Sequence, residues 1–217
     1  MAKLSKDIKV CMTKVGATPA SLTVTAATQA DPAVLTLSAQ PANGDILVLA
    51  NDSTGMIEID GKGWVAANAA AGGGVDAELL GSNTTNAKAF AAGSPVSHYD
   101  STMMQCLCLS QFDIQAEQPN TIAVGTYCNP QDALSAPSGQ AGTIAIAGYI
   151  DITDAGYQEL IKAVKDNAAY WWRVEFPDNG YILVEASVDQ IAWGIPLEGA
   201  LSFTGTLTMR RSPEHLF

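Results

Sequence analysis

The residue types best suited to catalysis form one short run. Residues 97–100 read Ser-His-Tyr-Asp, which are the side chains of a nucleophilic hydrolase. Adjacent side chains on an extended chain point in opposite directions, whereas a catalytic triad is assembled from distant loops. The chain has only 2 histidines, and the second, His215, lies in RRSPEHLF at the end of the sequence. We therefore expect no acyl-transfer catalysis from this run.

Other patterns that could support chemistry are equally weak. Asp151 and Asp154 have a spacing more typical of carboxylates at a helix start than of metal ligands. Glycines 72–74 resemble part of a phosphate-binding loop, but no Gly-Lys-Ser/Thr follows them, so we expect an ordinary loop. Spacing alone does not exclude a carboxylate pair for glycoside hydrolysis, but nothing singles one out. The sequence indicates a protein that is not an enzyme, with no cofactor and no metal.

The cysteines also suggest no active site. Cys11, Cys106, Cys108 and Cys128 form no CxxC pair and have no clustered histidines around them. Cys106 and Cys108 are two residues apart, so both would face the same side of a strand. We expect buried thiols in a reducing cytoplasm rather than disulfides or metal ligands.

Composition limits the partners. Acidic residues number 22 against 11 basic ones, a net charge of -11, so the chain lacks the cations that a nucleic-acid-wrapping protein needs. Only 15% of the residues are charged, against roughly 25% in a typical soluble domain. This low fraction suits a β-rich protein whose surface is partly covered by neighbours. We expect neither secretion nor a membrane span, because no apolar segment is long enough.

Strands with turns between them are expected in residues 17–98. SLTVTAATQADPAVLTLS predicts two strands around Asp31-Pro32, and a buried strand at Ile46–Leu49 should follow a positive-φ turn at Asn43-Gly44. GMIEIDGKGWVA alternates and predicts a hairpin that turns at Asp60-Gly61, and a further strand is expected near residues 75–80. These residues therefore predict a small β module.

Residues 99–217 combine predicted strands with one helix. TMMQCLCLSQF, TIAVGTYC and TIAIAGYI each predict a strand, and YWWRVEFPDNGYILVEASV predicts a hairpin that turns at residues 177–180. DITDAGYQELIKAVKDN has the helical period, so we expect a helix over about 154–167 with Thr153 or Asp154 as its N-cap. In GALSFTGTLTMRR strict alternation predicts a last strand with one apolar face and one hydroxyl-rich face.

Trp171 and Trp172 are the most prominent aromatic pair. On a strand, one ring points to the core and the other to the opposite face. Either both are structural, one in the core and one packed against the helix, or the second contacts a partner, as exposed tryptophans often do.

The order of these motifs resembles the major tail tube protein of long, non-contractile-tailed bacteriophages. The similarity covers residues 102–211 and a first strand near residues 10–15, and departs from the pattern at Asn179 and in the ending MRRSPEHLF. The matching positions in the helix and the following hairpin are Asp154, Gly156, Leu160, Ala163, Asn167, Trp172, Val174, Phe176, Pro177 and Asp178.

This resemblance implies a mainly β fold, an antiparallel sandwich or barrel-like tail tube fold with one flanking helix. Residues 1–16 and 99–217 would form the tube core domain. Residues 17–98 are similar to a small β module that recurs in phage tail proteins and is described by its likeness to the first-cysteine half-domain of ubiquitin-activating enzymes. The module would be an insertion on the outside of the tube, without ubiquitin chemistry.

The resemblance also implies a structural role. Such proteins form hexameric rings that stack into a hollow tube, through which genomic DNA passes without specific binding during ejection into the host. The implied partners are other copies of the chain, tail tip or baseplate and tail terminator proteins, and the tape measure protein during assembly. The implied location is the virion tail, with synthesis in the cytoplasm of the host bacterium.

Three groups of residues follow from this expectation. Asp113, Glu185 and Asp189 are candidate acids facing the bore, where the polar side of residues 202–208 would be exposed either to the bore or to another subunit. The candidate aromatics between subunits are Trp171 and Trp172. The candidate ring-stacking loop contains Asn129, Gln131, Asp132, Ser138 and Gln140.

Two alternatives remain open. The chain could be the tube subunit of a contractile tail or of a secretion-like machine, because these share the architecture. It could instead be a carbohydrate-binding β-sandwich with Trp171, Trp172 or Trp193 as the sugar platform.

Overall fold

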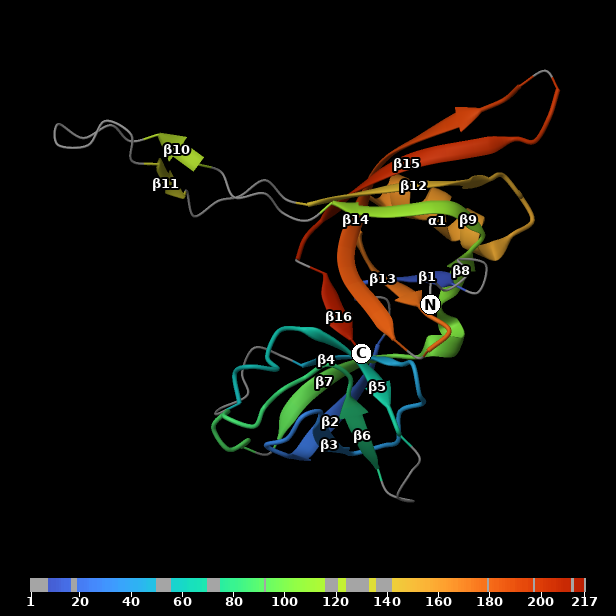
Figure 1. Cartoon of the computed structure of the whole chain (residues 1–217). Coiled ribbons are helices and arrows are strands. Elements are labelled where there is room, and N and C mark those ends of the chain that lie inside the picture. The colour runs from blue at the N-terminus through green and yellow to red at the C-terminus, as the bar shows by residue number, and fades with distance from the viewer. Residues whose placement is uncertain are drawn as a thin grey trace. The chain divides into compact units, whose positions relative to one another are not determined.

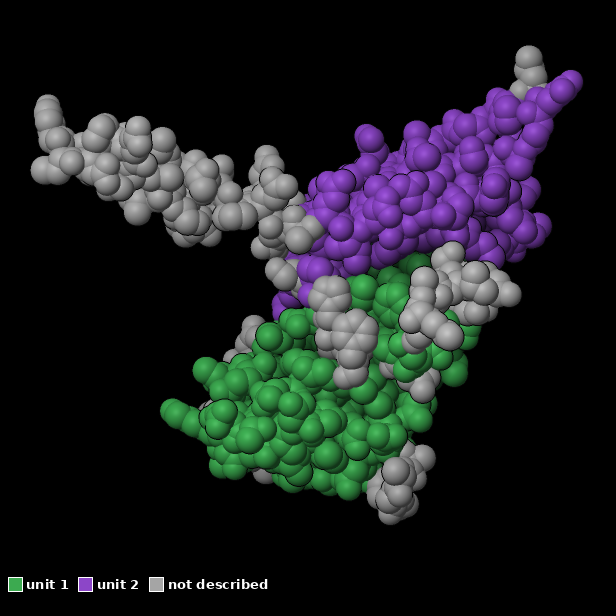
Figure 2. Space-filling model, in the orientation of Figure 1, with its two compact units in different colours: residues 1–107, 171–183, 214–217 green, residues 108–170, 184–213 purple. Residues whose placement is uncertain are grey.

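A computed structural model gives the structure of the chain (Figure 1). The residues that it describes are 8–16, 19–49, 56–69, 75–91, 93–115, 121–123, 133–135, 142–178, 180–196, 198–211 and 213–216. Within them, no helix is long and apolar enough to cross a membrane. The chain folds into two compact units (Figure 2). Unit 1 comprises residues 1–107, 171–183 and 214–217, and unit 2 comprises residues 108–170 and 184–213.

A closed six-stranded β-barrel forms most of unit 1. Around the barrel the order is β2-β3-β6-β5-β4-β7, and consecutive strands pair antiparallel. The predicted strands on either side of Asp31-Pro32, at Ile46–Leu49 and near residues 75–80 are confirmed, as is the positive φ of Gly44. The bounds are β2 Ala20–Ala27, β3 Ala33–Leu37, β4 Ile46–Leu49, β5 Gly63–Ala67, β6 Asp76–Leu79 and β7 Ser94–Tyr99.

The predicted hairpin around Asp60-Gly61 is wrong. Only its second arm is a strand, β5, whereas the residues before it form turns. Met56 and Ile59 are both fully buried although they are three residues apart, which a strand with its period of two does not allow. The carbonyl of Ile59 also accepts a hydrogen bond of 3.1 Å from the indole N–H of Trp64. Core packing therefore overrides the alternating pattern here.

The rest of unit 1 continues the barrel core into a second group of strands. β1 (Lys9–Lys14) pairs with β8 (Gln105–Leu107), and the sheet order continues from β1 to β13 (Ala169–Glu175) and then to β14 (Tyr181–Gly194). β16 (Glu214–Leu216) pairs with the start of β14. Trp171 and Leu183 belong to the same buried cluster as the barrel interior. A Cβ on Gly63 would lie 2.8 Å from the Trp171 ring, so this glycine permits the close packing.

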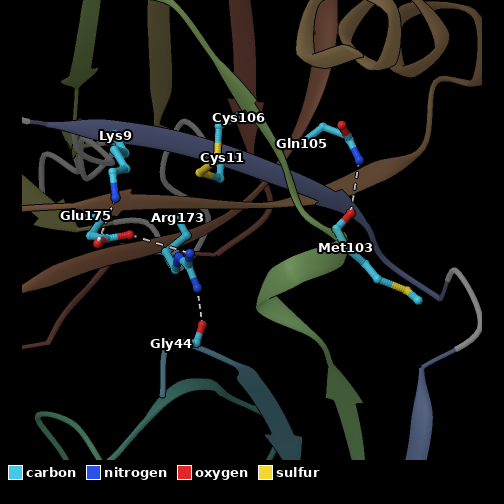
Figure 3. Close-up of a disulfide and its surroundings, with 8 residues drawn as sticks. All are labelled: Lys9, Cys11, Gly44, Met103, Gln105, Cys106, Arg173 and Glu175. Carbon is cyan, nitrogen blue, oxygen red and sulfur yellow. Dashed lines mark hydrogen bonds and ion pairs between the residues drawn. A yellow bond between two sulfur atoms is a disulfide. The ribbon is translucent and has the colours of Figure 1, made fainter. Parts of the chain in front are cut away.

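The expectation of buried thiols is wrong for three of the four cysteines. β1 and β8 place Cys11 directly opposite Cys106, with 3.8 Å between their Cα atoms, and the two form a disulfide (Figure 3). Cys108 follows β8 as an exposed free thiol, and Cys106 is exposed as well. The pairing of strands 95 residues apart decides this disulfide, which local spacing does not reveal. Cys128 lies outside the described residues.

Unit 2 is an antiparallel sheet with one helix. The sheet order is β14-β15-β12-β9, with β9 at Leu109–Gln115, β12 at Thr143–Tyr149 and β15 at Ser202–Met209. The predicted strand TMMQCLCLSQF is interrupted, because a 3-10 helix at Ser101–Met103 precedes β8 and Cys108 separates β8 from β9. Between β9 and β12, β10 (Thr121–Ala123) pairs with β11 (Ala133–Ser135).

The predicted helix is confirmed as α1, Ala155–Asp166. The carboxylate of Asp154 is the N-cap and accepts a hydrogen bond of 3.0 Å from the backbone N–H of Tyr157. Asn167 ends the helix in the left-handed conformation with φ 46. Together with the predicted β13–β14 hairpin, closed by the bond from the Phe176 N–H to the Gly180 carbonyl, this bears out a mainly β fold with one helix.

Candidate functional site

The sheet of unit 2 has a polar face built mostly from small or uncharged side chains. The register places Asp113, Ala145, Thr206 and Gln190 in one row across the four strands. Directly opposed residues share a face of a sheet, and so do residues two apart along a strand. We call this side the polar face; its residues are Gln111, Asp113, Gln115, Thr143, Ala145, Ala147, Thr204, Thr206, Thr208, Ser187, Gln190 and Ala192.

The opposite face is apolar, and α1 packs against it. Phe203 and Leu207 of β15 are buried there with Ile144 and Ile146 of β12. The ring of Tyr157 on α1 lies 5.5 Å from the ring of Phe203, centroid to centroid. The helix therefore covers one face of the sheet and leaves the other without cover among the described residues of unit 2.

The three acids predicted to face the bore all belong to the polar side of the sheet. Asp113 is exposed and accepts a hydrogen bond of 2.6 Å from the amide of Gln111. Asp189 is exposed at the irregularity in the β14–β15 pairing, and its carboxylate accepts a bond of 2.5 Å from the hydroxyl of Thr208. Glu185 lies two residues before Ser187 on β14 and therefore on the same side. Whether they face a bore stays a prediction.

The charge of this face is acidic or balanced. The polar face as defined contains no lysine or arginine. The exposed Arg210 follows Thr208 by two residues, beyond the end of β15, and Arg211 is held by Glu185 with 2.9 Å between Nε and Oε2. Hydroxyls, amides and methyl groups offer neither a nucleophile with an activating base nor a set of metal ligands. Within the described residues, no group of three or more metal-binding side chains occurs. The face is suited to contact without chemistry or tight binding.

Both lateral edges of this sheet are open among the described residues. β9 ends the strand order, so its outer edge has no partner strand. β14 has 14 residues and its hairpin partner β13 has 7, so the second half of β14 extends beyond β13. Three successive antiparallel pairings make β14 and β9 run in opposite directions. An open strand edge exposes backbone donors and acceptors that readily pair with another chain.

The predicted role of Trp171 and Trp172 between subunits is not supported by their positions. Both indole rings are buried within the chain, at 4% and 0% exposure. The exposed tryptophan is Trp193 on β14, half of whose surface is open to solvent. Sequence reasoning missed its neighbour Ile195, although an isoleucine between Gly194 and Pro196 in a turn was a usable signal. The five residues proposed for ring stacking lie outside the described residues.

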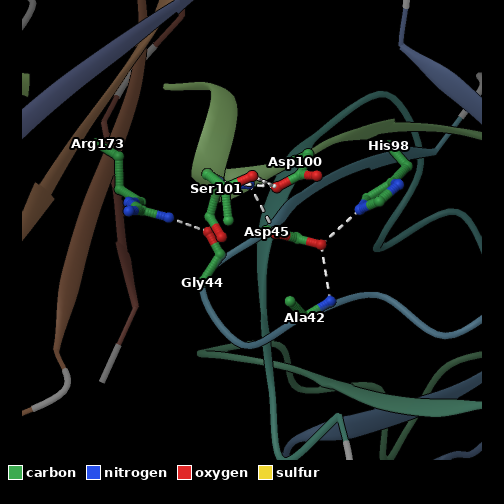
Figure 4. Close-up of polar contacts among 8 residues, drawn as sticks. Ala42, Gly44, Asp45, His98, Asp100, Ser101 and Arg173 are labelled. Atoms are coloured by element: carbon green, nitrogen blue, oxygen red, sulfur yellow. Dashed lines mark hydrogen bonds and ion pairs between the residues drawn. The ribbon is translucent and has the colours of Figure 1, made fainter. Parts of the chain in front are cut away.

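His98 and Asp100, the most reactive pair in the sequence, serve the structure of unit 1 instead (Figure 4). The buried carboxylate of Asp45 contacts His98 Nε2 at 2.5 Å and accepts hydrogen bonds from the backbone N–H groups of Ala42 at 2.7 Å and Ser101 at 2.8 Å. Asp100 instead caps the 3-10 helix through Thr102, and these hydrogen bonds lower the pKa of the Asp100 carboxyl. His98 thus bonds to a carboxylate outside the local run.

Comparison with known proteins gives a partial likeness to two solved structures. No family model and no curated protein matches the chain. A chain in the tail of an empty gene transfer agent (GTA) particle, computed with helical refinement and C6 symmetry, is 14% identical; the match covers 54% of this chain and 89% of that chain, with a TM-score of 0.43. A chain in the virion of a native GTA particle is 14% identical over 51% of this chain and 86% of that chain, with a TM-score of 0.41. A TM-score below 0.5 does not establish a common fold.

Proposed function

We propose that the chain is a structural subunit of a phage-like tail and that its unit 2 sheet lines the bore of a tube of stacked rings. The observation that carries this proposal is the sheet itself. One face is sealed by α1, the other is chemically quiet, and both lateral edges are open among the described residues. An enzyme or a receptor would need a reactive or strongly binding group on such a face, whereas the wall of a conduit needs none.

Ring formation follows from the two open edges. Because β9 and β14 run in opposite directions, β9 of one copy can pair antiparallel with the second half of β14 in the next copy. A contact between two different edges is head-to-tail, and it closes into a ring when the rotation between copies is suitable. Closure leaves neither of these two edges open. The resemblance to tail tube proteins suggests six copies.

The acidic character of the polar face supports passage of DNA. Duplex DNA carries one negative charge per roughly 1.7 Å of its axis. Lysine or arginine side chains on the wall that have no acidic partner would therefore retain the DNA. Asp113 and Asp189 repel phosphates within a screening length of about 8 Å at physiological salt. The barrel of unit 1 would decorate the outside. The tail tip or baseplate, the tail terminator and the tape measure protein remain the proposed partners.

Electron microscopy and sedimentation of the concentrated protein test the conduit. We expect rings and hollow tubes, with addition of purified tail tips as a seed if assembly requires one. A chain that stays monomeric with seeds present contradicts the proposal.

A charge reversal tests the role of the polar face. Tubes of Asp113→Lys should co-sediment with short duplex DNA at low salt, whereas wild-type tubes should not. Asp76→Lys is the matched control, because Asp76 is an exposed acid on a strand of the barrel. Equal DNA binding by the two variants would show that the polar face does not line the bore.

A sugar-binding role is a second candidate, and one observation favours it. Trp193 keeps an exposed ring, although its N–H is already donated to the Tyr157 hydroxyl at 2.9 Å. Stacking of a sugar on this ring would change the fluorescence of a monomeric protein. Trp171 and Trp172 are buried and cannot provide such a platform. The proposed conduit could equally be the tube of a contractile tail or of a secretion-like machine.

A further inference from the structure

Exposed apolar side chains gather at one end of unit 2. Ile195 is 77% exposed, Ile152 74% and Trp193 54%, values that are unusual for large apolar residues. Scattered exposed apolar residues are common on proteins, but a group of them marks an interaction site. We call this group the end patch; it consists of Tyr149, Ile152, Trp193, Ile195 and Leu201.

Hydrogen bonds hold the end patch in place. The backbone N–H of Ile150 donates to the carbonyl of Leu201 at 3.0 Å, which joins the β12–α1 loop to the β14–β15 turn. The side-chain amide of Gln158 on α1 donates to the carbonyl of Ile152 at 2.9 Å. Trp193 is anchored to Tyr157 of the same helix. A surface ordered before binding loses less conformational entropy when a partner covers it.

The position of the end patch indicates the direction from which a partner must come. β14 ends at Gly194, β15 begins at Ser202 and β12 ends at Tyr149, and the register places these three residues in one row. The end patch therefore surrounds strand ends, not strand edges. In a ring closed through the edges of β9 and β14, strand ends face along the ring axis, because strands in a barrel tilt by only about 35–45° from it.

We propose that the end patch is the docking surface for a second copy of this chain in the adjacent ring, an inference that rests on the proposed conduit. The contact joins the end of the sheet in one copy to the other end of the sheet in the next. Such a head-to-tail contact does not close and so extends a tube without limit. Each apolar contact is small, but a ring makes all of its contacts together, which multiplies their effect.

A double substitution tests the docking surface. Ile152→Ser with Ile195→Ser removes two of the most exposed apolar side chains without touching the sheet edges. We expect single rings or short stacks in place of tubes, seen by electron microscopy and as at least a tenfold fall in the mass of pelleted tubes. Ile57→Ser is the matched control, because Ile57 is 73% exposed in unit 1, and it should leave the tubes unchanged.

Fluorescence gives a second readout. Trp64, Trp171 and Trp172 are buried, so a blue shift of the emission on tube formation should come from Trp193 and should be absent from the double variant. Tubes of wild-type length from the double variant, with no change at Trp193, would falsify the docking surface while leaving the conduit intact. That is also the outcome if a membrane or a different tail protein covers the end patch. Wild-type protein that forms neither rings nor tubes overturns both proposals.

Discussion

The barrel of unit 1 and the sheet of unit 2 are built from similar antiparallel strands, but only the barrel closes on itself. The six barrel strands close on one another, so every strand has two neighbours. The unit 2 sheet has an edge strand at β9 and an overhanging half of β14. In the proposed tube, the strands that complete this sheet come from other copies. Within one chain, the open sheet is the part suited to assembly.

Polar side chains differ between the two regions in the same way. In the barrel, Ser82 and Thr84 are fully buried. Each hydroxyl accepts a hydrogen bond from a backbone N–H and donates one to a backbone carbonyl. On the polar face of unit 2, Gln111, Asp113 and Thr204 are exposed to solvent. Buried polar groups must find partners inside the protein, whereas exposed groups exchange with water at little cost. Barrel substitutions should therefore affect stability and polar-face substitutions assembly or passage.

Reduction of the disulfide should have the largest effect, and it should be confined to unit 1. The disulfide between Cys11 and Cys106 restricts a loop of 95 residues in the unfolded chain, a constraint that contributes about 4.7 kcal/mol in the chain-entropy model. We expect this loss in urea unfolding when dithiothreitol is added. Hydrogen exchange should show faster opening in peptides of unit 1 than in peptides of unit 2.

Both redox states should be measured in the Cys108→Ser variant, because this change removes the free thiol found among the described residues, which could exchange with the disulfide. An equal loss of protection from hydrogen exchange in the two units would contradict the prediction that the disulfide stabilises unit 1 alone.

Substitution of Asp45 should come next. Its carboxylate is 1% exposed and accepts bonds from two backbone N–H groups and contacts His98. Asp45→Ala leaves these donors without a partner, which should lower the free energy of unfolding by about 3 kcal/mol. Asp113→Ala, on the polar face, should change it by less than about 0.5 kcal/mol. Urea unfolding measures the free energy of unfolding of the two variants. Similar losses in both would contradict the predicted difference between the barrel and the polar face.

The sequence predicts what local patterns determine. The helix with its Asp154 cap, the β13–β14 hairpin and the alternating strand β15 follow from periods and turn residues within short windows. Placement of Asp113, Glu185 and Asp189 on one side of a sheet follows from the same alternation once the strands are paired.

Interactions between distant segments were not predictable from local patterns. The Cys11–Cys106 pairing depends on β1 meeting β8, and the burial of both tryptophans depends on how β13 packs on each face. Arg173 shows the same limit: its guanidinium is buried and donates to the carbonyl of Gly44, 129 residues away (Figure 3). The sequence around Arg173 and Gly44 does not predict this bond. Hydrophobic patterns and turn residues can be recognised in a short window, whereas the partner of a tertiary contact cannot.

The smallest predicted effect compares one tyrosine from each unit at alkaline pH. Tyr170 of unit 2 is fully buried, and burial, with the carboxylate of Glu159 next to it, raises the pKa of its hydroxyl. Burial and Glu175 also raise the pKa of Tyr181 in unit 1, but there Arg173, 5.7 Å from the ring centroid, opposes the shift. A tyrosine whose pKa is raised in the folded state leaves stability unchanged below about pH 10, its unfolded value, and lowers it as the pH rises further.

Phenylalanine keeps the buried ring and removes the ionisation. Tyr170→Phe should therefore flatten the fall of the free energy of unfolding between about pH 10 and 11.5, and Tyr181→Phe should flatten it less. Lysines that deprotonate in the same range do so in both variants, so the difference between the two pH profiles of urea unfolding isolates the tyrosines. A larger flattening for Tyr181→Phe would mean that Arg173 does not stabilise the ionised form of Tyr181, and that the electrostatic contrast between the units is misassigned.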